Sequence, residues 1–538
     1  MARVDALAPS AARPERGGAL AALLAGAGQA LALADPWTGQ AHGWLQMLTL
    51  AALVWLLLRG ASFWRGGALG WLFALGWLAG AFWWLFISMH TYGGLLAPLA
   101  LAAVLALAGF LALYYGVAAA LFAWLLGRKG LGVAWRALAF AALWTLAELA
   151  RGVLLTGFPW GAGGYAHVDG ALAFLPRYVG VYGLGFVSAA LAALLAQAGC
   201  VRWCHWRAMA LTAAALLAAG ASLWGARHCA INTCGAQAAA DSAQRLTMAV
   251  TLLQGNIAQD IKFAPGLGVE QSLAWYGEQL RAARTPLVVA PETALPMLPD
   301  QLPAGYWQAL RDHYSQGAQA ALLGVPLGSF ATGYTNSVAG FQPGQLTPYR
   351  YDKQHLVPFG EFVPRFFKWF VQMMRIPLGD FGRGALVQPS MHWQGQRLAP
   401  NICYEDLFGE ELAARFANAS QAPTAFVNVS NIAWFGDSVA MDQHLAISRM
   451  RALEFERPML RATNTGATAI IDHRGAVTAQ LPRLTRGALQ GHFEGRTAIT
   501  PYAWWAARLG LWPLAGWCTA LLLGALAWRR REKPAPAA

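Results

Sequence analysis

Long apolar runs separated by short polar stretches occupy both ends of the chain, and one long polar block lies between them. Seven apolar segments precede this block and one follows it. A helix needs about 20 apolar residues to cross the ~30 Å hydrocarbon core of a bilayer, and most of the segments are long enough. We therefore expect eight membrane spans, at 17–34, 40–58, 66–88, 95–126, 132–152, 177–198, 206–227 and 505–528.

This pattern divides the chain into three parts. Residues 1–228 form an N-terminal membrane domain with seven transmembrane helices. Residues 229–500 form a domain outside the bilayer, and residues 501–538 form a last transmembrane helix with a basic tail. The expected fold is therefore an α-helical membrane bundle with an α/β domain attached to it.

Lys and Arg side chains in the short connections lie almost entirely on one side of the predicted membrane. Positively charged loops stay in the cytoplasm, so both termini are expected there and the polar block on the opposite side. In a Gram-negative cell this places the chain in the inner membrane and the polar block in the periplasm. The periplasmic short loops carry Arg151 and Arg177, whereas the cytoplasmic side carries Arg3, Arg13, Arg16, Arg59, Arg65, Arg128, Lys129, Arg136, Arg202, Arg207, Arg529, Arg530, Arg531 and Lys533.

Within the polar block, short apolar runs alternate with amphipathic helical stretches. Near-continuous apolar strands between helices are typical of a sheet covered by helices on at least one face. Roughly 250 residues are ample for one hydrophobic core. The predicted strands are Met248–Leu253, Pro286–Ala290, Ala320–Val325, Leu398–Cys403 and Thr424–Val429, and the predicted helices are Val269–Ala283, Ala304–Gln316, Glu410–Ala419 and Met441–Glu456.

Composition supports a membrane protein and argues against a nucleic-acid partner. The chain of 538 residues is 57% hydrophobic and 12% charged, whereas soluble proteins have about 25% charged residues. Its net charge of +13 sits largely in the loops between apolar runs, where it sets topology. The six cysteines are too scattered for a disulfide scaffold. Cys229 and Cys234 either form a local disulfide or stay unpaired, and Cys200 and Cys204 lack a second pair to complete a zinc site, so no metal is expected.

Three reactive side chains in the polar block each come at or just after a predicted strand. They are the carboxylate of Glu292, the ammonium of Lys353 and the thiol of Cys403. A free thiol with a pKa near 8.5 is mostly protonated at neutral pH, so a nearby base and a nearby cation activate it. Glu292 is the candidate base, and Lys353 is the candidate stabiliser of the thiolate and of an oxyanion. Glu361 and Glu405 are candidate partners that keep Lys353 charged and oriented.

Each of these residues also has an ordinary explanation. Cys403 at the end of an apolar strand is, on its own, more often a small buried hydrophobe. Lys353 alone reads as a surface lysine, and Glu292 after Pro291 suits the start of a helix. Catalysis is therefore inferred from the three together with their flanking motifs.

Those motifs resemble the nitrilase superfamily, whose site is a Glu-Lys-Cys triad, and the membrane setting narrows the resemblance to the apolipoprotein N-acyltransferase family. The resemblance spans nearly the whole chain, and the segment around Lys353 is its most specific part. The matching segments are Gln254–Ile257, Ala290–Ala294, Tyr351–Glu361, Cys403–Glu405, Asn431 with Ala433–Gly436, Arg461–Gly466 and the membrane loop Phe158–Trp160.

The resemblance implies an αββα sandwich and a two-step acyl transfer that needs no cofactor. The donor would be a phospholipid, typically phosphatidylethanolamine, and the acceptor the α-amine of a diacylglyceryl-cysteine apolipoprotein. Glu292 would be the base, Cys403 the nucleophile and Lys353 the oxyanion stabiliser, with Glu361 in support. We further expect substrate contacts from Trp160, Phe263, Tyr404, Trp434 and Phe435, and a monomer, since nothing in the sequence demands a partner chain.

Two departures from the family pattern are visible. Ile432 stands where the family usually has an acidic residue, and Phe263 stands where it often has tryptophan. The stretch 362–381 is aromatic and basic at helical spacing, which favours an arm resting on lipid beside the site over a packed helix.

Two other functions use the same features differently. A membrane-tethered amidase would use the same triad with water as acceptor, but a soluble amide needs no set of membrane spans. A transporter with a periplasmic domain would carry charges along a path through its spans, and these spans hold very few.

Overall fold

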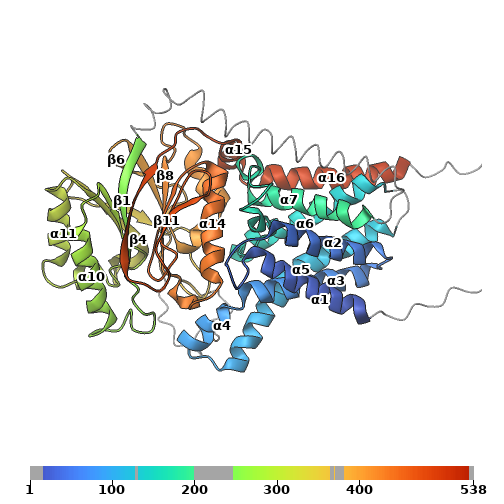
Figure 1. Cartoon of the computed structure of the whole chain (residues 1–538), viewed down its shortest axis with the longest axis horizontal. Helices are drawn as coiled ribbons and strands as arrows, with labels where there is room; N and C mark the ends of the chain where they lie inside the picture. The colour runs from blue at the N-terminus through green and yellow to red at the C-terminus, as the bar shows by residue number, and fades with distance from the viewer. Residues whose placement is uncertain (1–15, 128–130, 199–245, 364–368, 370–380, 532–538) are drawn as a thin grey trace, which may run out of the picture.

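The computed structural model describes residues 16–127, 131–198, 246–363, 369 and 381–531. A bundle of helices and a domain of two stacked sheets lie side by side along the long axis of the molecule (Figure 1). The expected span at 206–227, the pair Cys229 and Cys234, and most of the expected arm at 362–381 lie outside the described residues.

Apolar residues occur on all sides of the bundle helices, as expected for helices that pack together and also face hydrocarbon. The helices are α1 (Arg16–Leu33), α2 (Gly43–Leu58), α3 (Phe63–Phe82), α4 (Leu85–Ile87), α5 (Ala97–Leu126), α6 (Val133–Val153), α7 (Pro176–Gln197), α15 (Pro501–Leu509) and α16 (Trp512–Arg531). Large apolar side chains on α5, such as Leu101, Leu105 and Leu113, remain about half exposed, which suits contact with lipid.

Three helices in the described part of the chain are long and apolar enough to cross a membrane: α5, α6 and α7. The number rises to five if each of two bent pairs is one span, namely α3 with Leu85–Tyr92, bent by 58°, and α15 with α16, bent by 90°. Helices α1 and α2 are shorter apolar helices. The structure therefore supports a membrane protein and does not confirm eight spans. The bend at Gly510, whose φ is 55°, sets α15 across the direction of α16 and shortens the last expected span.

Two six-stranded sheets make up the second domain, and each combines parallel strands with antiparallel edge strands. The first sheet has the order β12 (Gly487–Glu494), β1 (Thr247–Gln254), β2 (Leu287–Val289), β3 (Ala320–Ser329), β4 (Gly333–Phe341) and β5 (Tyr349–Asp352). The second has the order β11 (Val477–Gln480), β10 (Ala469–Ile471), β9 (Met459–Thr463), β8 (Ala425–Ser430), β7 (Gln396–Ile402) and β6 (Met391–Trp393). Strands β1, β2 and β3 run parallel, as do β7, β8 and β9.

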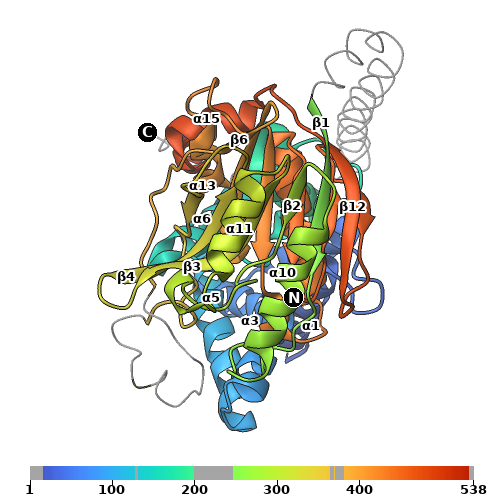
Figure 2. The same ribbon diagram turned by 90° about the vertical axis from the view of Figure 1, so that its left-hand side faces the viewer.

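The last strand of the domain completes the first sheet. β12 pairs antiparallel with β1 along the whole length of both strands, from Thr247 opposite Glu494 to Gln254 opposite Gly487. Figure 2 shows β12 beside β1 at one edge of that sheet. The beginning and the end of the domain are thus held together by backbone hydrogen bonds.

Helices cover the outer face of each sheet, so the layers follow the order helix, sheet, sheet, helix. On the first sheet, α10 (Gly268–Ala282) and α11 (Tyr306–Ser315) bury Leu273 and Leu310 (Figure 2). On the second, α13 (Gly409–Ala413) and α14 (Ala440–Phe455) bury Leu412 and Phe455. This arrangement confirms the expected nitrilase-like α/β domain.

The core between the sheets consists of aliphatic side chains that alternate along the strands. Val250, Leu252, Val427 and Val429 are fully buried there. Each such side chain stabilises the fold by about 1.5–3 kcal/mol through removal from water. The continuous apolar runs that predicted β1 and β8 arise because these strands are buried on both faces.

Helix α14 packs against the sheet with one side and against the helix bundle with the other (Figure 1). Ala446, Ile447 and Met450 belong to the same apolar cluster as the bundle helices. Polar contacts support this junction: Glu454 Oε1 accepts a hydrogen bond of 2.7 Å from the backbone N–H of Val181, just after the break in α7 at Gly180. The strand ends of the sandwich are thereby fixed relative to the membrane helices.

Candidate active site

Glu292 lies just beyond the carboxyl end of β2, in the parallel part of the first sheet. Its side chain is buried. Oε1 accepts a hydrogen bond of 2.7 Å from Nδ2 of Asn336 on β4, and Oε2 accepts one of 2.8 Å from the backbone N–H of Asn431, which follows β8 of the other sheet. Both oxygens are therefore held, and the carboxylate has one orientation.

Lys353 follows β5 and is almost completely buried. Its backbone N–H donates to the carbonyl of Asn336 at 2.8 Å, which continues the pairing with β4. Its Nζ lies 2.9 Å from Oε1 of Glu361 and 3.3 Å from Oε1 of Glu292. Burial alone would lower the pKa of Lys353, but the negative charges of Glu361 and Glu292 outweigh it and raise that pKa well above its ordinary value. The amine is therefore a permanent cation at neutral pH.

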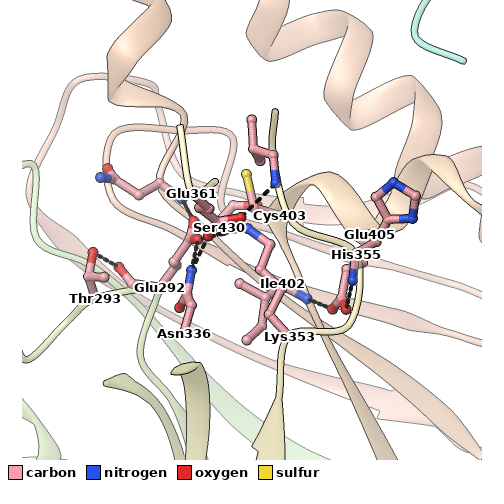
Figure 3. Close-up of polar contacts among 12 residues, drawn as sticks. Glu292, Thr293, Asn336, Lys353, His355, Glu361, Ile402, Cys403, Glu405 and Ser430 are labelled. Carbon is pink, nitrogen blue, oxygen red and sulfur yellow. Dashed lines mark hydrogen bonds and ion pairs between the residues drawn. The ribbon is translucent and has the colours of Figure 1, made fainter. Parts of the chain in front are cut away.

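Asn336 joins the two carboxylates. Its Nδ2 donates at 2.7 Å to Oε1 of Glu292 and at 2.7 Å to Oε1 of Glu361. The other oxygen of Glu361 accepts the backbone N–H of Val357 at 2.8 Å. One ammonium and one amide thus sit between two carboxylates, and the positive charge offsets the repulsion between them (Figure 3).

Cys403 comes directly after β7 and begins the short helix η6 (Cys403–Leu407). Its φ of 51° is in the left-handed region, which is uncommon outside glycine and is typical of residues held at functional sites. Burial, followed by the charge of Glu292, raises the pKa of the Cys403 thiol to about 12, while Lys353 and a hydrogen bond with Ser430 act in the opposite direction. The resting thiol is therefore protonated and needs a base. Figure 3 shows Cys403, Lys353 and Glu292 converging on one point.

Glu405 is buried on the far side of Lys353 from Glu292 and binds backbone groups and a phenol (Figure 3). Its Oε2 accepts the N–H of Ile402 at 2.6 Å and its Oε1 accepts the N–H of Gln354 at 2.7 Å. The hydroxyl of Tyr351 donates to the same carboxylate at 2.9 Å and 3.0 Å. Glu405 thus ties the end of β5 to the end of β7, so that the residues carrying the ammonium and the thiol are joined through one carboxylate.

A cavity of about 1330 Å³ opens at the convergence point and runs to the membrane helices. Glu292, Lys353 and Cys403 form part of its wall, and the remaining wall is largely apolar. Its membrane end is lined by Leu99, Leu107, Phe110, Leu111 and Tyr114 of α5. The cavity is large enough for a long apolar chain and places it beside the thiol.

The residues predicted to contact substrate all line this cavity: Trp160, Phe263, Tyr404, Trp434 and Phe435. Trp160 and Tyr404 are buried, whereas Phe263 is 36% exposed. Ile432 is fully buried, so it supplies no polar side-chain contact at this position. The substrate role of these residues stays a prediction.

Sequence reasoning did not single out Asn336 or Lys262. Lys262 is fully buried, and its Nζ donates to the carbonyl of Glu292 at 3.2 Å. Burial lowers the pKa of Lys262 to about 7, with the charge of Glu292 acting against the shift. Asn336 was missed because β4 was not predicted. Lys262 follows the Gln254 motif by a few residues and directly precedes the aromatic Phe263, and that position is the one signal that could have indicated it.

No group of three or more His, Cys, Asp or Glu side chains that could hold a metal occurs among the residues described in the structure. The chemistry that the site can perform is nucleophilic attack by a thiol, assisted by a carboxylate base and a fixed cation.

Two family models match the chain. One, described as "Apolipoprotein N-acyltransferase N-terminal domain", matches residues 25–194, and the other, described as "Carbon-nitrogen hydrolase", matches residues 235–499. The chain is 60% identical over 505 residues to a Verminephrobacter eiseniae protein named apolipoprotein N-acyltransferase, with 91% of this chain and 92% of the relative covered. It is 46% identical over 528 residues to a protein of that name from Ralstonia nicotianae, with 98% and 96% covered. Among solved structures it is similar to Saccharomyces cerevisiae Nit3, a member of branch 10 of the nitrilase superfamily, with 15% identity, 46% of this chain and 90% of that chain covered, and a TM-score of 0.34.

Proposed function

Because the chain belongs to the apolipoprotein N-acyltransferase family, we propose that it moves the sn-1 acyl chain of a phospholipid, through a thioester on Cys403, to the N-terminal α-amine of a diacylglyceryl-cysteine apolipoprotein. The observation that carries this proposal is the cavity. Its polar end holds Glu292, Lys353 and Cys403, and its apolar wall continues onto membrane helix α5. A soluble amide would not need such a wall, whereas an acyl chain would.

In the first half-reaction, the carboxylate of Glu292 takes the proton of the Cys403 thiol as Sγ attacks the sn-1 ester carbonyl. A C–S bond forms, and the carbonyl oxygen becomes an oxyanion that the ammonium of Lys353 stabilises. The C–O bond then breaks, and the proton on Glu292 goes to the departing lysophospholipid. The raised pKa of the thiol makes this proton transfer necessary, because little thiolate is present beforehand.

In the second half-reaction, the α-amine of the acceptor attacks the thioester carbon. A C–N bond forms, the C–S bond breaks, and Glu292 passes the amine proton to the departing Sγ. Water competes with the amine for the thioester, so the apolar wall also protects the intermediate. Glu361 and Asn336 keep Lys353 and Glu292 in place through both halves.

The remaining expectations become part of this proposal. We place the enzyme in the bacterial inner membrane with both termini in the cytoplasm and residues 229–500 in the periplasm, between membrane parts at 1–228 and 501–538. The donor is phosphatidylethanolamine, and the protein acts as a monomer. Trp160, Phe263, Tyr404, Trp434 and Phe435 contact the substrates from the cavity wall, which is supported by their place in its lining.

Intact mass spectrometry of the purified full-length protein tests the proposal. After incubation with phosphatidylethanolamine, the wild type should gain the mass of one fatty acyl group, and a diacylglyceryl-cysteine peptide should remove it. Cys403→Ala should gain nothing. Cys518→Ala, which changes the other free cysteine of the described chain, is the matched control and should behave as the wild type.

The outcomes separate the proposal from the amidase alternative. No acyl increment on a folded wild-type protein would contradict a lipid donor. If the acyl group is lost to water at the same rate with and without the peptide, the peptide is not the acceptor, and the result favours a hydrolase.

A further inference from the structure

His444 lies on α14, between the catalytic strand end and the membrane bundle, and its side chain is fully buried. One ring nitrogen, Nε2, lies 3.2 Å from the carbonyl oxygen of Cys403. The other, Nδ1, lies 2.6 Å from Nη2 of Arg461. The imidazole therefore bridges the candidate nucleophile and a buried guanidinium.

The partners of the ring fix its tautomer. A guanidinium only donates hydrogen bonds, so Nδ1 must accept from Arg461 and carries no proton. The remaining proton of a neutral imidazole is then on Nε2, which donates to the carbonyl of Cys403. Burial, followed by the positive charge of Arg461, holds the pKa of His444 well below its ordinary value, so the ring is neutral at physiological pH.

Arg461 is itself held from several sides. Its Nε donates to the carbonyl of Ala467 at 3.0 Å, and its Nη1 donates to Oγ of Ser448 at 2.7 Å. The carboxylate of Asp406 lies 3.6 Å from Nη1 and supplies the opposite charge. The guanidinium has no freedom to turn away from His444, so the tautomer is built into the fold.

The face of the His444 ring stacks on a residue of the membrane domain. Its centroid is 5.5 Å from that of Trp160, with an interplanar angle of 19°. The indole N–H of Trp160 donates to Oε1 of Gln443 at 2.7 Å, and the indole N–H of Trp84 donates to the same oxygen at 3.1 Å. Gln443 and His444, which are adjacent on α14, thus fix the catalytic domain relative to the helix bundle.

Cys403 needs such support because its backbone is left-handed. A non-glycine residue with φ of 51° persists only where its surroundings hold it, at a cost of about 1–3 kcal/mol. Its carbonyl receives the His444 hydrogen bond and a longer contact of 3.5 Å from Nδ2 of Asn428. If the peptide relaxed, the Cys403 side chain would turn away from Lys353 and Glu292.

We propose that His444 is a positioning residue for the acyl transfer. Its Nε2–H holds the Cys403 peptide in the reactive conformation, and the stacking of its ring on Trp160 fixes the position of Cys403 relative to the membrane domain. The acyl transfer in this inference rests on the proposed function, whereas the contacts of His444 with Cys403 and Trp160 do not depend on it. His444 touches no reacting atom, so its removal should slow the attack of Sγ without altering how tightly lipid binds.

Four variants of the full-length protein test the role of each ring nitrogen. The side-chain amide nitrogen of Gln reaches the position of Nε2, whereas the amide of Asn reaches only the position of Nδ1. His444→Gln therefore keeps the donor to Cys403, and His444→Asn keeps only a partner for Arg461. His444→Phe keeps the ring on Trp160 and loses both nitrogens, and His313→Phe on the outer helix α11 is the control for the substitution itself.

Two rates are measured beside the melting temperature: acylation by phosphatidylethanolamine, and alkylation of Cys403 by iodoacetamide. The peptide Leu398–Arg415 contains Cys403 as its single cysteine and reports alkylation after tryptic digestion. The alkylation rate needs no lipid. It therefore tests His444 even if the wild type forms no acyl-enzyme, an outcome that would contradict the proposed function alone.

We expect both rates to fall about 10- to 100-fold in His444→Phe and His444→Asn, which is the effect of one lost buried hydrogen bond. KM for lipid should stay unchanged, and His444→Gln and His313→Phe should stay within about threefold of the wild type. Equal rates in His444→Asn and His444→Gln would overturn the proposal, whether or not His444→Phe folds. So would a wild-type rate in His444→Phe, or a loss that appears only in KM.

Discussion

The hydroxyl of Tyr404 donates a hydrogen bond of 3.1 Å to the carbonyl of Gly157, which lies in a loop of the membrane domain. The residue that follows the candidate nucleophile is thereby bound to a segment 247 positions earlier in the chain. Its ring also packs against Phe158 and Phe408. The catalytic strand end and the membrane loop are thus one packed unit.

Replacing Tyr404 by Phe tests this link. The variant keeps both ring contacts but leaves the Gly157 carbonyl without its donor, so we expect a loss of stability of about 0.5–1.5 kcal/mol and a fall in acyl transfer of a few fold. Thermal melting in detergent and the acylation rate measure the two effects. Tyr306→Phe, which removes a partly buried hydroxyl–carbonyl hydrogen bond far from the site, is the control and should lower stability alone. Equal activity losses in both variants would contradict a special role for the link.

Lys353→Met removes the cation that two carboxylates share. Breaking a buried ion pair costs about 3–5 kcal/mol, and loss of an oxyanion stabiliser slows acyl transfer by about 10²–10³-fold. Lys353→Arg keeps the charge and should recover stability, but the planar guanidinium does not fit the position of Nζ, so activity should stay low. Melting temperatures and acylation rates distinguish the two effects. A stable and active Met variant would show that the ammonium is dispensable.

The pH dependence of Cys403 alkylation follows from its raised pKa of about 12. The alkylation rate should rise about tenfold per pH unit from pH 7 to 10 without levelling off, because thiolate is the reacting form. The same peptide in the urea-unfolded protein should level off near pH 8.5–9. A plateau below pH 9 in the folded protein would mean that Lys353 outweighs burial.

The same raised pKa has a consequence for stability. The folded state favours the protonated thiol. The contribution of the Cys403 thiol to the free energy of unfolding is therefore complete below about pH 9 and is lost as pH rises toward 12. The melting temperature of the wild type should therefore fall relative to that of Cys403→Ala across this interval. A difference that does not vary with pH would contradict the shift.

Lys262 affects stability with the opposite pH dependence to Cys403: its contribution to the free energy of unfolding is lost as pH falls. Burial lowers the pKa of Lys262 to about 7, whereas in the unfolded chain this pKa has the ordinary value of 10.5. The contribution of Lys262 to the free energy of unfolding is therefore present above pH 10.5 and is lost as pH falls to 7. The melting temperature of Lys262→Met relative to the wild type should rise as pH is lowered across this interval. Lys262→Gln, which retains a donor toward the Glu292 carbonyl, should follow the same trend. A constant difference for both variants would indicate that the amine is charged in the folded protein.

The strands that were predicted are largely buried on both faces, but β9 is buried as fully and was not predicted because Arg461 and Thr463 interrupt its apolar pattern. β1 and β8 are continuous apolar runs, so hydrophobicity alone indicated them. β4 was not predicted because three successive polar residues, Thr335, Asn336 and Ser337, interrupt its apolar pattern, and Asn336 is the one that contacts Glu292. β12 was missed because its side chains alternate between exposed and half-buried. Such an alternation gives only a weak hydrophobic pattern compared with the long apolar runs elsewhere in the chain.

The site shows a similar limit. Glu292, Lys353 and Cys403 were selected from their motifs and their places at strand ends, and the structure brings them together. The contacts from Asn336 depend on the order of the strands in the first sheet, and those from His444 depend on how α14 packs against the second sheet and the bundle. Neither arrangement is encoded at short range. His444 is especially hard to detect because α14 is buried on two sides, so burial does not distinguish the residue that faces the site from its neighbours.

The pairing of β12 with β1 restricts when the enzyme can become active during its synthesis. The first sheet lacks its edge strand until Glu494 has left the ribosome, and Cys403 belongs to a second sheet that packs on the first. A nascent chain that has already inserted its early helices therefore carries no assembled thiol site. The domain that carries the thiol is therefore complete only after translation has passed β12.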